Sequence, residues 1–233
     1  DIRTINKNRF EEYIKRPEEK NNKIIYKDFN NNDLDENILR PFKNPFSSNG
    51  GINVVTGNIG KGIVKISSVK SIHQKICEQA EIFETPEEFS KAFEKGSLNK
   101  NCVVVIRGQG PKSNGMPELH SLNPILSVIQ NLGYRIALIT DGRMSGASGS
   151  VLTVVHVNPE TNDGGVISKI KKSDFIEIDA QKGTMNVKIS NKLLDKRLVS
   201  YTSTDYSSGY GRELFKTNRH QVTSSDTGAI SIG

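Results

Sequence analysis

Two apolar runs near the middle of the chain, Cys102–Ile106 and Arg135–Ile139, predict strands that are covered on both faces. Between them, Leu122, Ile125, Leu126, Ile129 and Leu132 recur at helical spacing, and Gly133 marks the end of that helix. A strand, a helix and a second strand in this order predict a βαβ unit, whose two strands lie parallel in one sheet. The loops that come after the two strands should therefore open at the same, carboxyl edge.

The remaining hydrophobic pattern predicts further strands and short helices around this unit. Thr85, Pro86 and Glu88 have the spacing of a capping box with a first-turn proline, and Gly96 ends the helix that they begin. The segment Ser71–Gln79 is expected to be a loop. The other predicted elements are strands at Ile52–Thr56, Gly62–Ser67 and Val151–Val157, a hairpin formed by DFIEID and TMNVKI, and a helix at Asn191–Ser200. The fold class is thus α/β, with a mixed, barrel-like sheet and flanking helices.

The first part of the chain is polar and carries no apolar periodicity. Residues 1–44 are predicted to be a linker or arm, and Pro41 and Pro45 mark an extended entry to the next domain. Residues 45–190 are predicted to form the β/β/α domain, and residues 191–233 a C-terminal helix and tail that either packs on the domain or reaches a partner.

Composition narrows the class of protein. The chain has 34% apolar and 25% charged residues, and its apolar runs are too short for a membrane span. The net charge is +6, but the basic residues are spread along the chain, which argues against nucleic acid as a partner. Cys77 and Cys102 lack CxxC spacing, so the chain alone predicts neither a structural zinc site nor a complete iron–sulfur site. Without a recognisable secretory signal, the default localisation is cytoplasmic.

The two loops at the predicted carboxyl edge carry the candidate chemistry. RGQGPKSNGMPELH contains Glu118 and His120, and DGRMSGASGS contains Ser145. Glu118 is either a ligand for a divalent metal ion or a cap for the next helix. Ser145 is a nucleophile, a base or a hydrogen-bond donor, and a base role requires a neighbouring cation because a serine hydroxyl is a very weak acid. GRMSGAS does not match the GxSxG nucleophile pattern, and His120 near a helix start is more often structural or substrate-facing than part of a triad.

These segments resemble a known family. VVVIRGQGPKSNGMPELH, IALITDGRMSGASG, VVHVNPE and DFIEID are similar, in order, to the C-terminal domain of the dihydroxyacid and sugar-acid dehydratases, and the resemblance extends from about Leu39 to Ala229. Within the family, MPELH, the SGAS form of the serine loop and the GRELF and SSDTGA segments are most similar to members that act on 6-phosphogluconate.

The resemblance implies a swivelling β/β/α domain of a hydro-lyase that removes water from 6-phosphogluconate. It implies an iron–sulfur cluster, expected to be 4Fe–4S and bound by an N-terminal domain that is missing here, together with magnesium. On this chain Ser145 matches the family's base and Glu118 its magnesium ligand, and we predict that Arg143, Gly146 and His120 contact the substrate. The chain is then expected to be inactive alone and to belong to an enzyme that is a homodimer at full length.

Two alternatives remain. The same domain is found in enzymes that dehydrate dihydroxyacids or unphosphorylated sugar acids; a phosphate-binding patch involving Arg143, His120 or the tail residues Arg212 and Arg219 would distinguish these from a phosphogluconate enzyme. The second alternative is a non-catalytic binding or assembly module, with the tail and the positive charge as its working surface.

Overall fold

A computed structural model describes residues 3–5, 7, 9, 15–28, 35–47, 50–145, 149–201, 209 and 213–231. The chain divides into two compact units, Asp1–Asn49 and Gly50–Gly233. In the first unit, β1 (Lys15–Lys20) and β2 (Lys23–Asp28) form an antiparallel hairpin. Asn21 and Asn22 connect them with φ values of 54° and 57°, because asparagine tolerates the left-handed conformation that a two-residue hairpin turn requires. This hairpin was not predicted from the polar composition of the segment.

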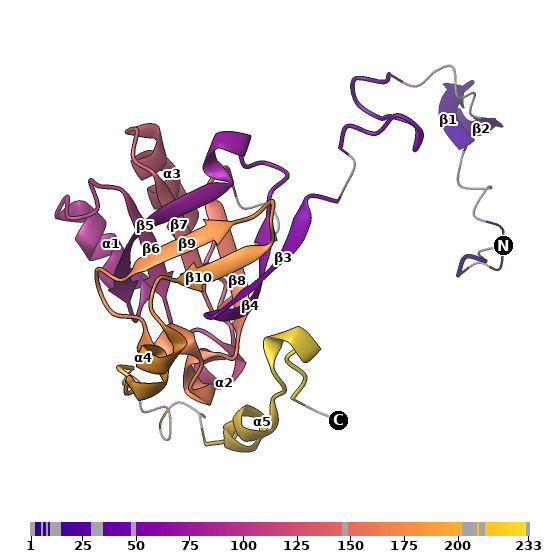
Figure 1. Ribbon diagram of the computed structural model, residues 1–233. Helices are drawn as coiled ribbons and strands as arrows, with labels where there is room; N and C mark the ends of the chain where they lie inside the picture. Colours follow the sequence, from indigo (N-terminus) through magenta and orange to yellow (C-terminus); the bar gives the residue numbers. More distant parts are fainter. Residues whose placement is uncertain are drawn as a thin grey trace. The chain divides into compact units, whose positions relative to one another are not determined.

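The second unit is built on a closed barrel of eight strands with the order β10-β3-β4-β8-β7-β6-β5-β9 (Figure 1). Neighbouring strands β5 to β8 are parallel, and the remaining pairs are antiparallel except for a single parallel pairing of β10 with β3. The strands are β3 (Ile52–Gly57), β4 (Gly60–Lys65), β5 (Lys75–Phe83), β6 (Cys102–Ile106), β7 (Ile136–Thr140), β8 (Leu152–Asn158), β9 (Phe175–Asp179) and β10 (Thr184–Val187). The structure confirms the predicted α/β class with a mixed, barrel-like sheet.

Short helices flank this barrel (Figure 1). They are α1 (Pro86–Glu94), α2 (Pro111–Asn114), α3 (Leu122–Asn131), α4 (Asn191–Lys196) and α5 (Lys216–Gln221), with 3-10 turns η3 (Ser71–His73), η4 (Thr161–Asp163), η5 (Val166–Lys169) and η6 (Ser225–Thr227). Among the described residues, no helix is long and apolar enough to cross a membrane.

The central apolar runs are explained by two separate cores. Along β6, Val103 and Val105 point into the barrel, whereas Val104 and Ile106 pack against the layer of α1 and α3. All five residues of β6 and all five of β7 are buried, as expected for strands covered on both faces. The parallel register of β6 with β7, across α3, confirms the predicted βαβ unit.

The predicted start of α1 is also confirmed. The hydroxyl of Thr85 accepts a hydrogen bond from the N–H of Glu88 at 3.2 Å. The carboxylate of Glu88 reaches back one residue beyond the cap, where it accepts the N–H of Glu84 at 2.9 Å. These two bonds satisfy donors that a helix start would otherwise leave unpaired.

Two predictions about local structure were wrong. Ser71–Gln79 is not a loop, because β5 begins at Lys75 and places Ile76 and Ala80 in the barrel core. Its apolar positions are interspersed with lysine, cysteine and glutamate, so the run did not look like a strand. The helix predicted at Asn191–Ser200 ends at Lys196, where Arg197 turns to an extended conformation and pairs with Asp174.

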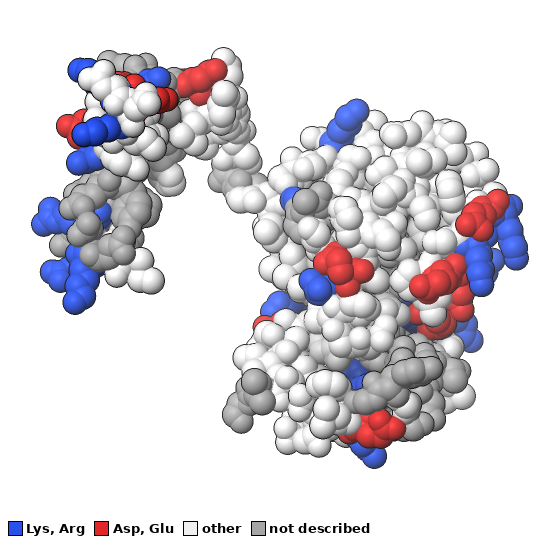
Figure 2. Space-filling model, turned by 180° about the vertical axis from the view of Figure 1, so that it is seen from behind, with Lys and Arg blue, Asp and Glu red and all other residues white. Residues whose placement is uncertain are grey.

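Many charged side chains on the surface of the barrel form ion pairs. Glu81 on β5 contacts both Lys100 and Lys172, and Glu78 on the same strand lies 3.7 Å from Arg135. On the face that Figure 2 shows, basic and acidic side chains are interspersed. On this face the basic side chains are mixed with acidic ones rather than gathered into one stripe.

Candidate functional site

The loops after β6 and β7 meet at the carboxyl edge of the sheet, as the βαβ unit predicted. A short parallel bridge pairs Glu118 with Arg143, and the N–H of Leu119 donates to the carbonyl of Arg143 at 3.1 Å. Ser145 comes two residues later. Glu118 and Ser145 are thus held on two backbone segments that are directly hydrogen-bonded to each other.

The carboxylate of Glu118 is the centre of this arrangement. Its Oε1 accepts the backbone N–H of Ser145 at 2.7 Å and that of His120 at 3.1 Å, and its Oε2 lies 3.1 Å from Nη1 of Arg143. Arg143 also donates from Nε to the carbonyl of Met116 at 2.8 Å. Both carboxylate oxygens therefore face donors, and the negative charge of Glu118 is balanced by the guanidinium of Arg143.

The predicted site residues fall into three groups. Ser145, Glu118 and Arg143 are brought together. His120 joins this cluster through its backbone N–H, and the residue itself is exposed. Gly146 lies outside the described residues.

Ser145 lines a cavity of about 250 Å³ whose other walls are largely apolar. Ile52 and Ile63 contribute from the neighbouring hairpin, and His156 contributes from β8. Burial, and to a smaller extent the charge of Arg143, lowers the pKa of the His156 imidazole. A neutral histidine therefore shares a cavity with the candidate serine. From the sequence, His156 was predicted only as part of a strand, although it opens the HVNPE motif at the end of that strand.

Asp141 is a second residue whose importance was not predicted from the sequence. It is fully buried at the end of β7, where its carboxylate accepts N–H groups from Gly108 at 3.2 Å, Gln109 at 2.9 Å and Thr161 at 2.9 Å. Burial raises the pKa of Asp141, and these hydrogen bonds act in the opposite direction. One carboxylate thus fixes the loops after β6 and β8 to the start of the serine loop.

Glu160 also holds the loop after β6, through Lys112 and Ser113. Its buried carboxylate accepts the N–H groups of Lys112 at 3.0 Å and Ser113 at 2.8 Å, together with the Ser113 hydroxyl. Burial raises the pKa of Glu160, and the bonds from Lys112 and Ser113 oppose this shift. A side chain at Gly110 would come within 2.7 Å of the Glu160 carboxyl group, so glycine permits this close approach.

The cysteines do not fit an iron–sulfur cluster. Cys102 is buried in the layer between the sheet and the helices, and burial raises the pKa of its thiol to about 12, whereas cluster ligands are thiolates. Cys77 lies on the exposed face of β5. In the part of the chain that the structure describes, no three His, Cys, Asp or Glu side chains are grouped so as to hold a metal ion. Glu118 fits magnesium as a single carboxylate ligand, which is fewer than a complete site needs.

A known protein family has a similar sequence in the loops after β6 and β7, which carry Glu118 and Ser145. The model of the dihydroxy-acid/6-phosphogluconate dehydratase C-terminal family matches residues 37–229, which include these loops. The chain belongs to this family. The resemblance seen in MPELH and the serine loop is thereby confirmed.

Individual relatives in the family give the same result. The chain is 42% identical over 228 residues to phosphogluconate dehydratase of Helicobacter pylori, covering 95% of the chain and 37% of that protein. It is 38% identical over 233 residues to phosphogluconate dehydratase of Escherichia coli K12, covering all of the chain and 39% of that protein. Dihydroxy-acid dehydratase of Sulfurisphaera tokodaii is 37% identical over 203 residues, covering 84% of the chain and 35% of that protein. The chain therefore spans somewhat more than a third of the length of these curated relatives.

Proposed function

We propose that this chain is the part of a 6-phosphogluconate dehydratase that supplies the serine base and one magnesium ligand. The reaction would remove water from 6-phosphogluconate and give 2-keto-3-deoxy-6-phosphogluconate. The observation that carries the proposal is the 2.7 Å hydrogen bond from the backbone N–H of Ser145 to the Glu118 carboxylate. It places a hydroxyl-bearing residue next to a metal-binding type of side chain, which is the arrangement that a serine base requires.

The role proposed for Ser145 is to take the proton from the carbon next to the substrate carboxylate. Its hydroxyl has to lose a proton first, and positive charge nearby favours that loss. Lys65 lines the Ser145 cavity, and Arg143 lies beside it, paired with the Glu118 carboxylate. The neutral state of His156 leaves a nitrogen in the same cavity that is able to accept a proton. Ile52 and Ile63 add apolar surface to the wall of this cavity.

Glu118 is proposed to hold the magnesium ion. Magnesium, when bound, would supply the positive charge that stabilises a deprotonated serine and holds the carboxylate end of the substrate. A second cavity of about 340 Å³ is lined by Glu118 together with Glu84 and Glu87. Glu118 alone provides few ligands, so we expect weak magnesium binding by the isolated chain.

The cluster and the remaining metal ligands are proposed to come from the part of the enzyme that this chain does not span. The relatives are more than twice as long as the matched region, which leaves room for another domain. The cytoplasmic location and the homodimer stay predictions, which fractionation and sedimentation of the whole enzyme would test.

A chimaeric enzyme tests the proposal directly. The matched segment of the Helicobacter pylori phosphogluconate dehydratase would be replaced by this chain, the protein prepared without oxygen, and 2-keto acid formation from 6-phosphogluconate measured. We expect activity, and a loss of about a hundredfold or more on Ser145→Ala, which is the usual contribution of a general base. Ser150→Ala, in the same loop, is the matched control.

A second substrate class is favoured by one observation, the 37% identity to the dihydroxy-acid dehydratase of Sulfurisphaera tokodaii. The same chimaera would be assayed with a dihydroxyacid and with unphosphorylated gluconate. Turnover of these substrates in preference to 6-phosphogluconate would keep the serine mechanism and replace the substrate. A folded, cluster-loaded chimaera that is inert on all of them would contradict the dehydratase proposal.

A further inference from the structure

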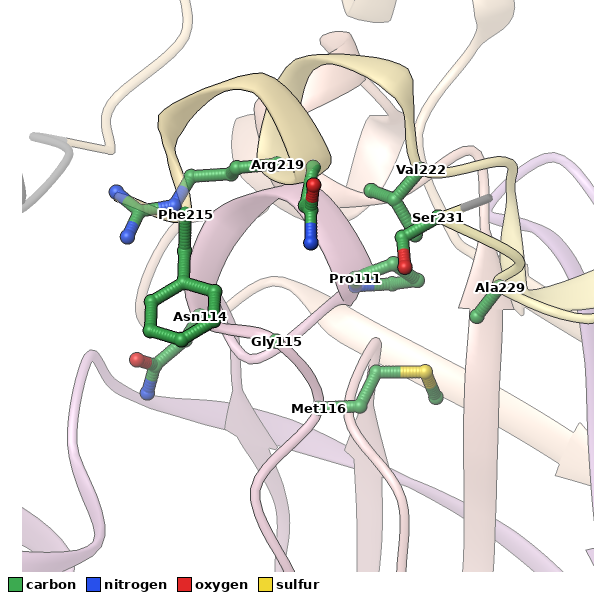
Figure 3. Close-up of a pocket in the computed structure, with 10 residues that line it drawn as sticks. Pro111, Asn114, Gly115, Met116, Phe215, Arg219, Val222, Ala229 and Ser231 are labelled. Carbon is green, nitrogen blue, oxygen red and sulfur yellow. The ribbon is translucent and has the colours of Figure 1, made fainter. Parts of the chain in front are cut away.

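A separate pocket of about 310 Å³ lies between the loop after β6 and the C-terminal tail (Figure 3). Pro111, Asn114, Gly115 and Met116 line it on one side. The tail contributes its other wall, with Phe215, Asn218, Arg219, Val222, Ala229 and Ser231. Neither the proposed base nor the proposed metal ligand is among these residues, so this pocket is additional to the site described above.

The charge of this pocket is opposite to that of its neighbour. Among the described residues that line it there is one cation, Arg219, and no carboxylate. The cavity beside Glu118 is lined by Glu84, Glu87 and Glu118 and, among the described residues, by no lysine or arginine. Oε2 of Glu84 is buried and has no hydrogen-bond partner in the part of the chain that the structure describes. The tail pocket therefore suits an anion, whereas in the other cavity Glu84 and Glu118 are paired with Arg107 and Arg143.

The two cavities are neighbours. Asn114 lines both of them, and its amide donates to Oε1 of Gln109 at 3.0 Å, on the side of the acidic cavity. Met116 lines the tail pocket and is two residues from Glu118. Gly115 and Met116 both have positive φ values, 70° and 52°, and the loop turns sharply here between the two cavities. A ligand that crosses this loop would meet Glu118 at one end and Arg219 at the other.

The tail that carries Arg219 is attached to the barrel. The hydroxyl of Ser225 donates to the carbonyl of His156 at 3.1 Å, and the amide of Asn158 donates to Asp226 at 3.0 Å. α5 also packs against α2. In Figure 3 the guanidinium of Arg219 and the amide of Asn114 lie on the same side of the pocket. The arginine is therefore presented by a supported segment, as a binding residue should be.

We propose that this pocket binds the phosphate group of a phosphomonoester, with Arg219 as its principal contact. A guanidinium offers paired N–H donors that match two phosphate oxygens, and the amide of Asn218 adds a neutral donor. Met116 and Phe215 give the carbon chain of the ligand an apolar surface. The identity of the ligand as a phosphorylated sugar acid rests on the proposed function, whereas phosphate binding itself does not.

Phosphate binding is tested on the chain itself, without any turnover. The full chain would be titrated with inorganic phosphate, glycerol 3-phosphate and glycerol, and the affinities measured by NMR chemical shifts. We expect the two phosphates to bind and to shift resonances of the residues that line the tail pocket, whereas glycerol does not. Arg219→Gln should weaken phosphate binding by about tenfold or more, since it removes a charge-assisted contact.

Two control variants test whether the loss of phosphate binding is specific to the guanidinium of Arg219. Lys216→Gln, on the same helix but outside the lining, removes an equal charge and should leave the affinity unchanged. Arg219→Lys keeps the charge but removes the paired donors, and should give an intermediate affinity. Phosphate binding that is absent, or equal in Arg219→Gln and Lys216→Gln, would overturn the inference.

The chimaeric enzyme separates this inference from the proposed function. In an active chimaera, Arg219→Gln should raise KM for 6-phosphogluconate more than it lowers kcat, whereas Lys216→Gln should leave both unchanged. An active chimaera whose KM is unaffected would contradict the phosphate site and leave the dehydratase function standing. If instead the chain binds phosphate through Arg219 but gives no active chimaera, the phosphate site stands and the dehydratase function is contradicted.

Discussion

The backbone N–H of Ser145 donates to Oε1 of Glu118 over 2.7 Å, although 27 positions separate the two residues in the chain. Their proximity results from β6 and β7, which are adjacent parallel strands and therefore release their loops at the same edge. The bond fixes the backbone of the serine rather than its hydroxyl. Glu118 thus sets the position of the Ser145 backbone.

Replacing Glu118 should loosen the serine loop without unfolding the protein. In Glu118→Ala, the N–H groups of Ser145 and His120 lose their common acceptor, and we expect their amide hydrogens to exchange about tenfold faster. The free energy of unfolding should change by less than about 1 kcal/mol, because the ion pair with Arg143 is exposed. Hydrogen exchange measured by NMR is the test. Glu87→Ala, which removes another carboxylate from the same cavity, should leave both amides unchanged.

Replacing Asp141 should have a much larger effect on stability. Asp141→Ala leaves the N–H groups of Gln109 and Thr161 without their buried acceptor, and that of Gly108 with only the hydroxyl of Thr161. We expect the free energy of unfolding to fall by about 2 kcal/mol or more, as judged by urea denaturation. Asp163→Ala is the control, because that carboxylate pairs with Lys112 at a partly exposed position and should cost less than about 1 kcal/mol. Equal losses in the two variants would show that Asp141 does not hold the loops together.

Much of this arrangement could be predicted from the chain, because its signals are local. The apolar runs of β6 and β7, the periodicity of α3 and the capping residues of α1 each specify one element, and their order implies the edge where Glu118 and Ser145 meet. The role of Asp141 could not be predicted, since its partners come from two other loops. The same applies to His156, which reaches the Ser145 cavity only because β8 pairs with β7.

The role of Arg107 could also not be predicted from the sequence, and it leads to a further prediction. Its side chain is 5% exposed, and it donates to Oε1 of Glu84 at 2.6 Å and to the carbonyls of Ser168 and Ile170 at 3.1 Å. It also contacts Ser200 through both the hydroxyl and the carbonyl. No sequence pattern marks such a residue, because its partners lie 23 to 93 positions away.

We expect Arg107→Met to lower the free energy of unfolding by about 2 kcal/mol or more, since it leaves the carbonyls of Ser168 and Ile170 and the partly buried carboxylate of Glu84 without this donor. The segment around Ser200 should also become sensitive to proteases. Arg135→Met is the matched control, because Arg135 is half exposed and should cost less than about 1 kcal/mol. Urea denaturation and limited proteolysis would check both effects, and an Arg107→Met variant as stable as the control would contradict the assignment of a buried network.

His156 provides a prediction about pH. In the folded protein, burial and then the charge of Arg143 lower the pKa of this imidazole below its ordinary value of 6.5. As pH falls through 6.5, the unfolded chain therefore takes up a proton on His156 before the folded chain does. More protons are bound in the unfolded state, so the free energy of unfolding decreases as pH falls through this window and is fully restored above it.

The variant that tests this dependence is His156→Asn. His156 has a φ of 57°, and asparagine is among the residues that best tolerate this conformation, but it does not titrate near neutrality. Urea denaturation from about pH 8 to about pH 5 should show a shallower loss of stability in His156→Asn than in the parent chain. His73→Asn, at a histidine outside the Ser145 cavity, should retain the parent slope. If the parent and His156→Asn lose stability in parallel, the neutral state of His156 contributes nothing to folding, and its proposed readiness to accept a proton beside Ser145 loses its support.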